Sequence, residues 1–304
     1  MGCSSPETPE TPETPETPET PETPETPETP ETPETPETRG TRKRSRIGVG
    51  MLSVVVGPWR GAPVVLRNAE VPHDAASTMK MAVLAAVYRS GLDLDAAVPV
   101  VNEFTSAVGG TYANDQAYDS DPEPWRLLES GAPEPPTATL RWLAERMITH
   151  SSNLATNLCL AQVGQAAVAE AWRRANATRS ASPRGIEDYA AREAGVHNRV
   201  TALDLVRLLE SLEPEPLELL ERNTWRVDLA AGLPPGTRIA FKNGWFEGVR
   251  HSAAVVRPED APPYALAVCY TGPLASGHDE LDPAAGLLAR ISAQVWERRH
   301  QLAS

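Results

Sequence analysis

Strand-like runs lie toward both ends of the apolar part of the chain, and helical patterns lie between them. Two β-branched runs, 47–56 and 62–67, flank a turn-forming segment and predict a β-hairpin. Further strands are predicted late in the chain, at 238–245, 250–257 and 264–270. Helices are predicted at 78–90, 138–149, 153–176, 201–212 and 281–299.

This order of elements predicts an α+β fold in which strands from both chain ends pair into one antiparallel sheet. The last helix, 281–299, is expected to pack on that sheet. The helices between the two groups of strands are expected to form an all-helical subdomain at about residues 81–225. Because a cleft between subdomains is a usual place for a ligand, we expect the functional site where the two meet.

Residues 6–38 are uninterrupted Pro-Glu-Thr repeats without an apolar residue, and a basic linker follows them up to residue 46. Such a segment cannot bury enough apolar surface to offset the entropy of ordering, so residues 1–46 are expected to be disordered. The folded domain is expected at 47–304. The repeats hold eleven of the 41 acidic residues, which leaves 30 acidic against 28 basic residues elsewhere. The overall charge of −13 therefore arises mainly from the tail. No nucleic-acid partner is expected.

The apolar run after the linker, 47–57, has two interpretations. The basic residues before it imitate a secretory signal, but Pro58-Trp59-Arg60 follows where a small-residue cleavage site would lie. A first strand is therefore favoured, and no convincing signal peptide is expected. No apolar run reaches the length of a membrane span. The three cysteines and six histidines show no metal-ligand spacing, so no metal and no other cofactor are expected.

The first candidate for chemistry is Ser77-Thr78-Met79-Lys80, at the start of the predicted helix 78–90. Ser77 and Lys80 are three residues apart and therefore share one face of a helix. A helix N-terminus favours negative charge developing on the serine. A lysine whose pKa is lowered by burial can accept the serine's proton.

Lysine usage adds weight to this candidate. The chain has only three lysines, Lys43, Lys80 and Lys242, among 28 basic residues. Arginine cannot serve as a base because its pKa is too high, whereas a buried lysine can. Two lysines in the folded part therefore indicate chemistry. The alternative is that they are surface residues that arginine has not replaced.

Two further motifs follow in order, Ser151-Ser152-Asn153 between two predicted helices and Lys242-Asn243-Gly244 on a predicted strand. Ser-x-x-Lys, Ser-x-Asn and Lys-x-Gly in this order resemble the three motifs of the class A β-lactamases and penicillin-binding proteins. The resemblance covers residues from about 47 to the C-terminus. It implies the β-lactamase/transpeptidase-like fold and a serine hydrolase that works through an acyl-enzyme.

Carried over to this chain, the resemblance implies that Ser77 is the nucleophile and that Lys80 helps to deprotonate it. Ser151 would relay a proton to the leaving nitrogen. Asn153 would bind the amide side chain of the substrate and Lys80. Glu187, on the loop before the predicted helix 201–212, would activate the deacylating water, with Asp188 as the second choice. Acidic residues on a solvated loop are the alternative for both.

The third motif supplies the expected substrate-binding groups. The resemblance implies that Lys242 provides positive charge for the pKa of Lys80 and for a substrate carboxylate. Gly244 would let the strand approach the substrate, and the backbone N–H groups of Ser77 and Trp245 would form the oxyanion hole.

Two motif positions differ from the family, because Ser152 stands where the family usually has Asp and Asn243 where it usually has Thr or Ser. Asn243 is expected to contact the substrate carboxylate in place of that hydroxyl. Arg250 or His251 on the next strand is a further candidate for this carboxylate, with a core or surface role as the alternative.

Three functions remain open. The first is β-lactam hydrolysis. The second is acylation by another small-molecule amide or ester, as in a D-Ala-D-Ala carboxypeptidase or an esterase. The third is a non-catalytic β-lactamase-like binding module. A monomer is expected. The family implies an extracytoplasmic location, which the chain as written leaves undetermined.

Overall fold

The centre of the fold is a five-stranded antiparallel sheet in the order β2-β1-β11-β10-β9. The computed structural model describes residues 1–2, 50–129, 135–277 and 282–302. The strands of the sheet are β1 (Met51–Pro58), β2 (Val65–Arg67), β9 (Arg238–Phe246), β10 (Val249–Arg257) and β11 (Tyr264–Thr271). Two strands come from the start of the folded part and three from its end, which confirms the predicted sheet.

The first and last strands of the chain pair directly. β1 runs antiparallel to β11 from the pair Met51–Thr271 to the pair Pro58–Tyr264, and β2 covers the other edge of β1. The predicted start of the first strand, 47–49, lies outside the described residues. The Pro-Glu-Thr repeats and the linker, predicted to be disordered, lie outside them as well.

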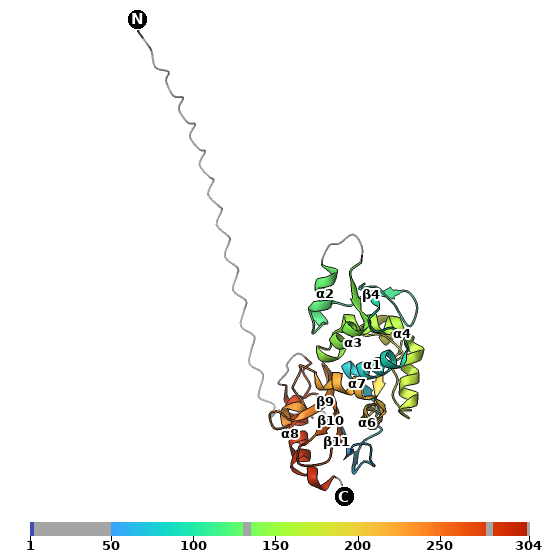
Figure 1. The fold of residues 1–304 in the computed structure, drawn as a ribbon, viewed down its shortest axis with the longest axis vertical. Helices are drawn as coiled ribbons and strands as arrows, with labels where there is room; N and C mark the ends of the chain where they lie inside the picture. Colours follow the sequence, from blue (N-terminus) through green and yellow to red (C-terminus); the bar gives the residue numbers. More distant parts are fainter. Residues whose placement is uncertain (3–49, 130–134, 278–281, 303–304) are drawn as a thin grey trace, which may run out of the picture. The chain divides into compact units, whose positions relative to one another are not determined.

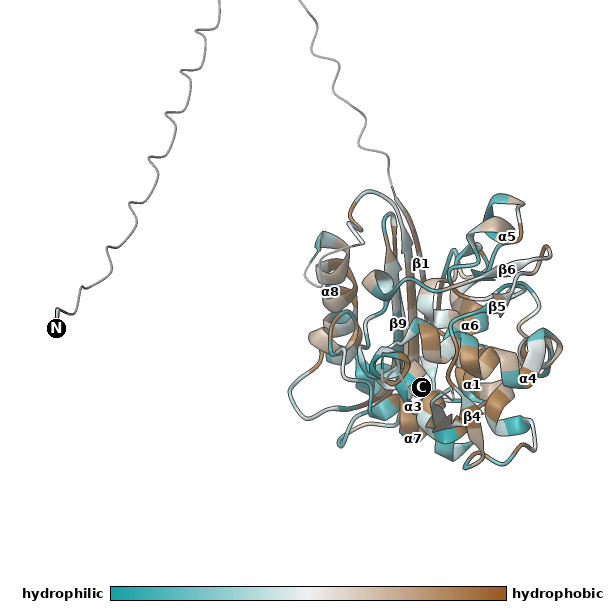
Figure 2. Ribbon diagram, turned by 90° about the horizontal axis from the view of Figure 1, so that it is seen from above, coloured by the Kyte–Doolittle hydropathy of each residue, from teal (hydrophilic) through white to brown (hydrophobic). Residues whose placement is uncertain are grey.

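Helices cover both faces of the sheet (Figure 2). The helix α8 (Pro283–Glu297) packs on one face, and α6 (Ala202–Ser211) packs on the other. Alternate strand residues serve the two sides, since Val55 belongs to the core shared with α6, whereas Val54 and Val56 belong to the core shared with α8.

The helical part of the fold lies beyond α6 (Figure 1). Its central helices are α1 (Lys80–Arg89), α3 (Leu140–Thr149) and α4 (Asn153–Arg174), which pack against one another. The predicted helices 78–90, 138–149, 153–176 and 201–212 correspond to α1, α3, α4 and α6. The pattern missed the shorter helices α2 (Glu123–Leu128), α5 (Tyr189–Glu193) and α7 (Pro214–Glu221).

Short strand pairs connect the loops of this part. They are β3 (His73–Asp74) with β8 (Arg199–Val200), β4 (Ala97–Pro99) with β7 (Thr137–Thr139), and β5 (Phe104–Thr105) with β6 (Thr111–Tyr112). The pair β3–β8 places the segment before Ser77 beside the segment after residue 198.

Two predicted helices differ in detail from the structure. The first begins with a separate 3-10 turn, η1 (Ala76–Met79), before α1 takes over at Lys80. The long helix α4 is interrupted at Gly164, which has a φ of 77°. Glycine adopts this conformation without strain because it has no Cβ. Within the described residues no helix has both the length and the apolar character needed to cross a bilayer.

Candidate active site

A cavity of about 560 Å³ opens where the sheet edge meets the helical part. Its wall includes residues from η1, the start of α4, the loop around Tyr118, the segment 184–192 and the end of β9. The lining side chains and backbone include Ser77, Ser151, Asn153, Glu187, Gly244 and Trp245. They represent all three motifs, the residue directly after the third motif and the predicted deacylation loop.

Ser77 lies on the wall of this cavity because a strained turn leads into η1. Ala76, the residue before it, has a positive φ of 44°, and the Ala75 N–H donates to Asn198 O at 3.0 Å. The edge strand β9 passes very close to this turn. A Cβ added to Gly244 would lie 2.7 Å from the Ser77 nitrogen, so this approach requires glycine.

Lys80 is completely buried, and its ammonium group contacts only neutral oxygens. The Lys80 Nζ donates to Ser151 O at 2.6 Å, to Asn153 Oδ1 at 2.8 Å and to Ser151 Oγ at 3.3 Å. Burial lowers the pKa of Lys80 to about 8, although the Asp119 and Glu187 carboxylates act in the opposite direction. A neutral amine, which can accept a proton, is therefore readily reached near neutral pH.

Lys242 approaches the same serine hydroxyl from the sheet. The Lys242 Nζ donates to Ser151 Oγ at 2.9 Å and to Asn243 O at 3.1 Å. Burial, and then the positive charge of Lys80, lower the pKa of Lys242 well below its ordinary value. Ser151, with a positive φ of 61°, thus places its hydroxyl between two buried amines. That position suits a hydroxyl that passes protons between them.

Asn153 connects this group to Glu187. Its Oδ1 accepts from Lys80, while its Nδ2 donates to Glu187 Oε1 at 2.7 Å and to Tyr118 O at 3.0 Å. One amide side chain therefore lies between the lysine and the carboxylate to which the resemblance assigns proton transfer.

Glu187 points into the cavity from a strained backbone, with φ of 66° and only 7% of its surface exposed. Its other carboxylate oxygen accepts from the Asp115 N–H at 2.7 Å. Burial raises the pKa of Glu187, while the hydrogen bonds from Asp115 and Asn153 oppose the rise. These features agree with a general base in a cleft.

Asp188, the second choice for that role, is used elsewhere. Its carboxylate accepts from Ser106 Oγ at 2.8 Å, from Ala107 N at 2.9 Å and from Ala191 N at 3.2 Å. It is fully buried, caps the short helix α5 and ties that helix to the β5–β6 hairpin. Glu187 therefore lines the cavity, and Asp188 does not.

The side chains of Asn243 and Trp245 lie on the opposite face of the sheet from Lys242. Asn243 Nδ2 donates to Trp225 O at 2.9 Å, and Asn243 Oδ1 accepts from Ser252 Oγ at 2.8 Å. The Trp245 ring packs edge-on against Trp225 at 5.8 Å between centroids. Both residues border the cavity, but the amide of Asn243 is engaged within the protein.

The two candidates on β10 are buried as well. Arg250 forms ion pairs with Asp228 at 2.6 Å and Asp282 at 3.3 Å, beneath the Trp245 ring. His251 faces the other way, where its Nε2 contacts Asp74 O at 2.9 Å and its Nδ1 accepts from Tyr270 N at 3.1 Å. Neither side chain lines the cavity, so the core role, left open for both by the sequence, describes their place in this structure.

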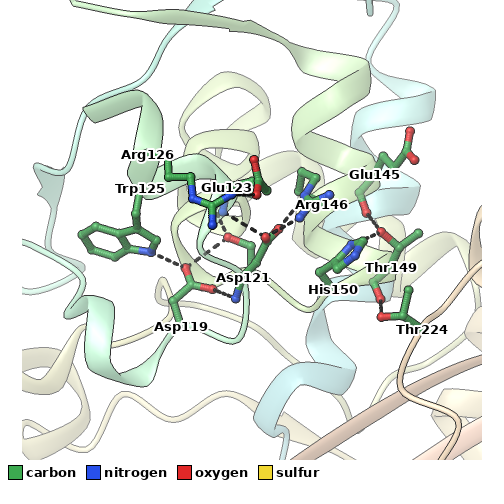
Figure 3. A network of polar contacts seen from close by, with 12 residues as sticks. Asp119, Asp121, Glu123, Trp125, Arg126, Glu145, Arg146, Thr149, His150 and Thr224 are labelled. Carbon is green, nitrogen blue, oxygen red and sulfur yellow. Dashed lines mark hydrogen bonds and ion pairs between the residues drawn. The ribbon is translucent and has the colours of Figure 1, made fainter. Parts of the chain in front are cut away.

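Sequence reasoning missed several residues around the cavity. Arg192 lies 5.0 Å from the Phe246 ring centroid and pairs with Asp74 at 3.3 Å, and Tyr118 is exposed at the entrance. Another missed residue is Asp119, which accepts from Asn153 N at the start of α4. It also accepts from the Trp125 indole N–H (Figure 3). Arg192 lies in the five-residue helix α5, Tyr118 in a 3-10 turn and Asp119 directly after it. Such short segments show no period, so no local signal distinguished these residues. Among the described residues no group of three or more His, Cys, Asp or Glu is arranged to hold a metal ion.

Comparisons with known proteins identify the family and the fold. The profile of the beta-lactamase enzyme family matches residues 49–298. No curated protein sequence matches the chain.

Solved structures show the same fold at low identity. An ancestral class A β-lactamase (GNCA) has a TM-score of 0.65 and 22% identity, and the match covers 82% of this chain and 94% of that one. A β-lactamase from Xanthomonas campestris has 0.64 and 19%, covering 84% and 92%. A PBP-A mutant, in an acyl-enzyme complex with penicillin G, has 0.62 and 20%, covering 84% and 93%. Likeness at this identity concerns the fold alone.

Proposed function

Because the chain belongs to the beta-lactamase enzyme family, we propose that it hydrolyses β-lactams through an acyl-enzyme on Ser77. The observation that carries the proposal is the meeting of two buried amines at one hydroxyl. Lys80 and Lys242 both contact Ser151 Oγ, and among the described residues neither amine has a carboxylate ion partner.

Acylation begins when neutral Lys80 takes the proton of the Ser77 hydroxyl. The Ser77 oxygen then bonds to the lactam carbonyl carbon, and the oxyanion is stabilised by the backbone N–H groups of Ser77 and Trp245. When the carbon–nitrogen bond breaks, the leaving nitrogen takes the proton of Ser151. The proton now held by Lys80 restores the Ser151 hydroxyl.

Deacylation uses Glu187, the second group that the Asn153 side chain contacts. Glu187 takes a proton from water, and the resulting hydroxide attacks the acyl carbon. The Ser77 oxygen leaves as the acyl bond breaks and takes up the proton that Glu187 received from water, which releases the opened product and restores both groups. The contact of Asn153 with both Lys80 and Glu187 supports this arrangement because it holds the two bases on one side of the cavity.

The test compares covalent labelling by a fluorescent penicillin with turnover of a chromogenic cephalosporin. The wild type should turn over, and Ser77→Ala should lose both labelling and turnover. Glu187→Gln should still be labelled, but its turnover should fall about 100-fold or more because the general base is missing. Labelling that survives Ser77→Ala would refute the proposal for Ser77, and unchanged turnover in Glu187→Gln would refute the role of Glu187.

A second candidate function, an esterase of the same fold, is favoured by one observation. The Asn243 amide is engaged with Trp225 and Ser252, and Arg250 is engaged with Asp228, so neither of these groups is offered to a substrate carboxylate. An ester without a carboxylate would lose less from this arrangement than a penicillin. Faster hydrolysis of a p-nitrophenyl ester than of the cephalosporin, lost in Ser77→Ala, would decide for the esterase.

A further inference from the structure

A carboxylate contacts the start of α4 although the second motif lacks one. Position 152 is serine, and the carboxylate comes from Asp119, on the loop between the 3-10 turn η2 (Gln116–Tyr118) and α2. One oxygen of Asp119 accepts from four donors: Leu154 N at 2.9 Å, Asn153 N at 3.0 Å, Trp125 Nε1 at 3.0 Å and Ser152 Oγ at 3.1 Å. Its other oxygen accepts from Asp121 N at 3.0 Å.

All five partners of Asp119 are donors, which explains why this position needs a carboxylate. Only a group without hydrogen-bond donors of its own matches such a set on both oxygens. Two of the partners, the N–H groups of Asn153 and Leu154, belong to the first turn of α4, where backbone donors lack helical acceptors. The positive end of the α4 dipole favours the negative charge there as well.

Ser152 also links the Asp119 loop to the start of α4. Its hydroxyl oxygen accepts from Ala155 N at 3.1 Å as the N-cap of α4, and its proton is donated to Asp119. A small N-cap residue therefore leaves room for a carboxylate from a distant loop.

The residue held in this way is Asn153. Its backbone N–H is fixed by Asp119, while its side chain contacts Lys80 and Glu187. Tyr118, directly before Asp119, accepts from the same Asn153 side chain at 3.0 Å. The loop that carries Tyr118 and Asp119 is therefore held against the start of α4 at the cavity wall.

We propose that Asp119 is a positioning residue that replaces the carboxylate missing at position 152 and holds Asn153 between Lys80 and Glu187. The proposal rests on the acylation of Ser77 proposed above. Asp119 also acts through its charge, since its carboxylate raises the pKa of Lys80 against the lowering by burial. Removing the charge and removing the contacts should therefore have separable effects.

The first measurement is the rate of labelling by a fluorescent penicillin at subsaturating concentration. Asp119→Ala should slow labelling about 100-fold, because a shift of about 1 Å in a positioning group costs that much. The matched control is Asp121→Ala, on the same loop. Asp121 is also buried, but its carboxylate pairs with Arg146 and not with the start of α4 (Figure 3). The control should lower thermal stability and keep the labelling rate of its folded fraction within a few-fold.

The second measurement returns the carboxylate to the motif. Asp119→Ala combined with Ser152→Asp should recover at least about tenfold of the lost rate, because a carboxylate again lies beside the loop and the helix start. Labelling of Asp119→Ala at the wild-type rate would overturn the proposal, and so would a folded double variant that is no faster than Asp119→Ala.

The third measurement uses Asp119→Asn, which keeps the shape of the side chain if the alanine variant does not fold. The midpoint of the labelling rate against pH should move below that of the wild type, because the charge that raises the pKa of Lys80 is gone. The amide protons of Asn153 and Leu154 should exchange faster with solvent, and this readout needs no substrate. An unmoved midpoint together with unchanged exchange would overturn the proposal.

The failures of the two proposals are distinguishable. A wild type that is not labelled at Ser77 contradicts the proposed function and removes the catalytic role of Asp119 with it. A labelled wild type with an equally fast Asp119→Ala contradicts only the role of Asp119.

Discussion

Buried cations occupy both faces of the sheet near β9 and β10, but their surroundings differ. On the cavity face, the ammonium groups of Lys80 and Lys242 contact hydroxyl, carbonyl and amide oxygens. On the opposite face, Arg250 is equally buried and pairs with the carboxylates of Asp228 and Asp282.

This difference separates chemistry from structure. Burial destabilises the charged form of a cation that has no paired carboxylate. Its pKa therefore falls, and its neutral form becomes accessible. A buried guanidinium with carboxylate partners remains charged and fixes its neighbours. Lysine on the cavity face and arginine on the other therefore match the two roles.

The largest effect is expected for Lys80→Arg. An arginine keeps the positive charge but cannot become neutral, so labelling of Ser77 should slow about 1,000-fold or more. The rate of covalent labelling by a fluorescent penicillin measures it. Lys43→Arg makes the same exchange at the third lysine of the chain and should change nothing. A rate within tenfold of wild type in Lys80→Arg would show that charge alone suffices on the cavity face.

On the opposite face, Arg250→Met should act on stability and not on chemistry. It leaves Asp228 and Asp282 buried without their counter-charge, which should lower the free energy of unfolding by about 3–5 kcal/mol in urea denaturation at pH 8. Arg238→Met, which breaks an exposed ion pair with Glu221, should cost about 0–1 kcal/mol.

This loss of stability should depend on pH. Burial raises the pKa of Asp228 to about 6 even beside Arg250, and without the arginine that pKa should rise further. Protonated Asp228 needs no counter-charge, so the destabilisation in Arg250→Met should be smaller at pH 5 than at pH 8. A loss that is equal at both pH values would contradict a charge-based role for Arg250.

The smallest effect, about tenfold, is expected in the pH profile of the wild type. Lys80 must be neutral to accept the proton of Ser77, and its pKa is lowered from 10.5 to about 8, first by burial. The labelling rate should therefore rise with pH, with a midpoint near 8 and about one tenth of the plateau rate at pH 7. A labelling rate that does not rise between pH 6 and 9 would show that acylation does not depend on neutral Lys80.

Much of the fold followed from patterns that are local in the chain. The five main strands and the long helices were predicted because β-branched runs and helical periods extend over many residues. The short helices α2 and α7 were missed, since six and eight residues hardly show a period.

The side of the sheet on which Asn243 lies did carry a signal in the sequence. Consecutive residues of a strand point to opposite faces, so the side chains of Lys242 and Asn243 lie on opposite faces of the sheet. The pairing of Asn243 with Ser252 across the strands is the consequence of that alternation.

The sequence by itself determined which chemical groups the protein has and which of them lie together locally. Ser77 and Lys80 are neighbours on one turn, and Ser151 and Asn153 are separated by one residue. Only the tertiary structure decided what those groups can do. Burial lowers the pKa of Lys80, and the distant Asp119 and Glu187 oppose that change. Arg250 is removed from the cavity by two carboxylates far from it in the chain. Desolvation and neighbouring charge set the ionisation of a group, and both arise from segments that meet only in the folded protein.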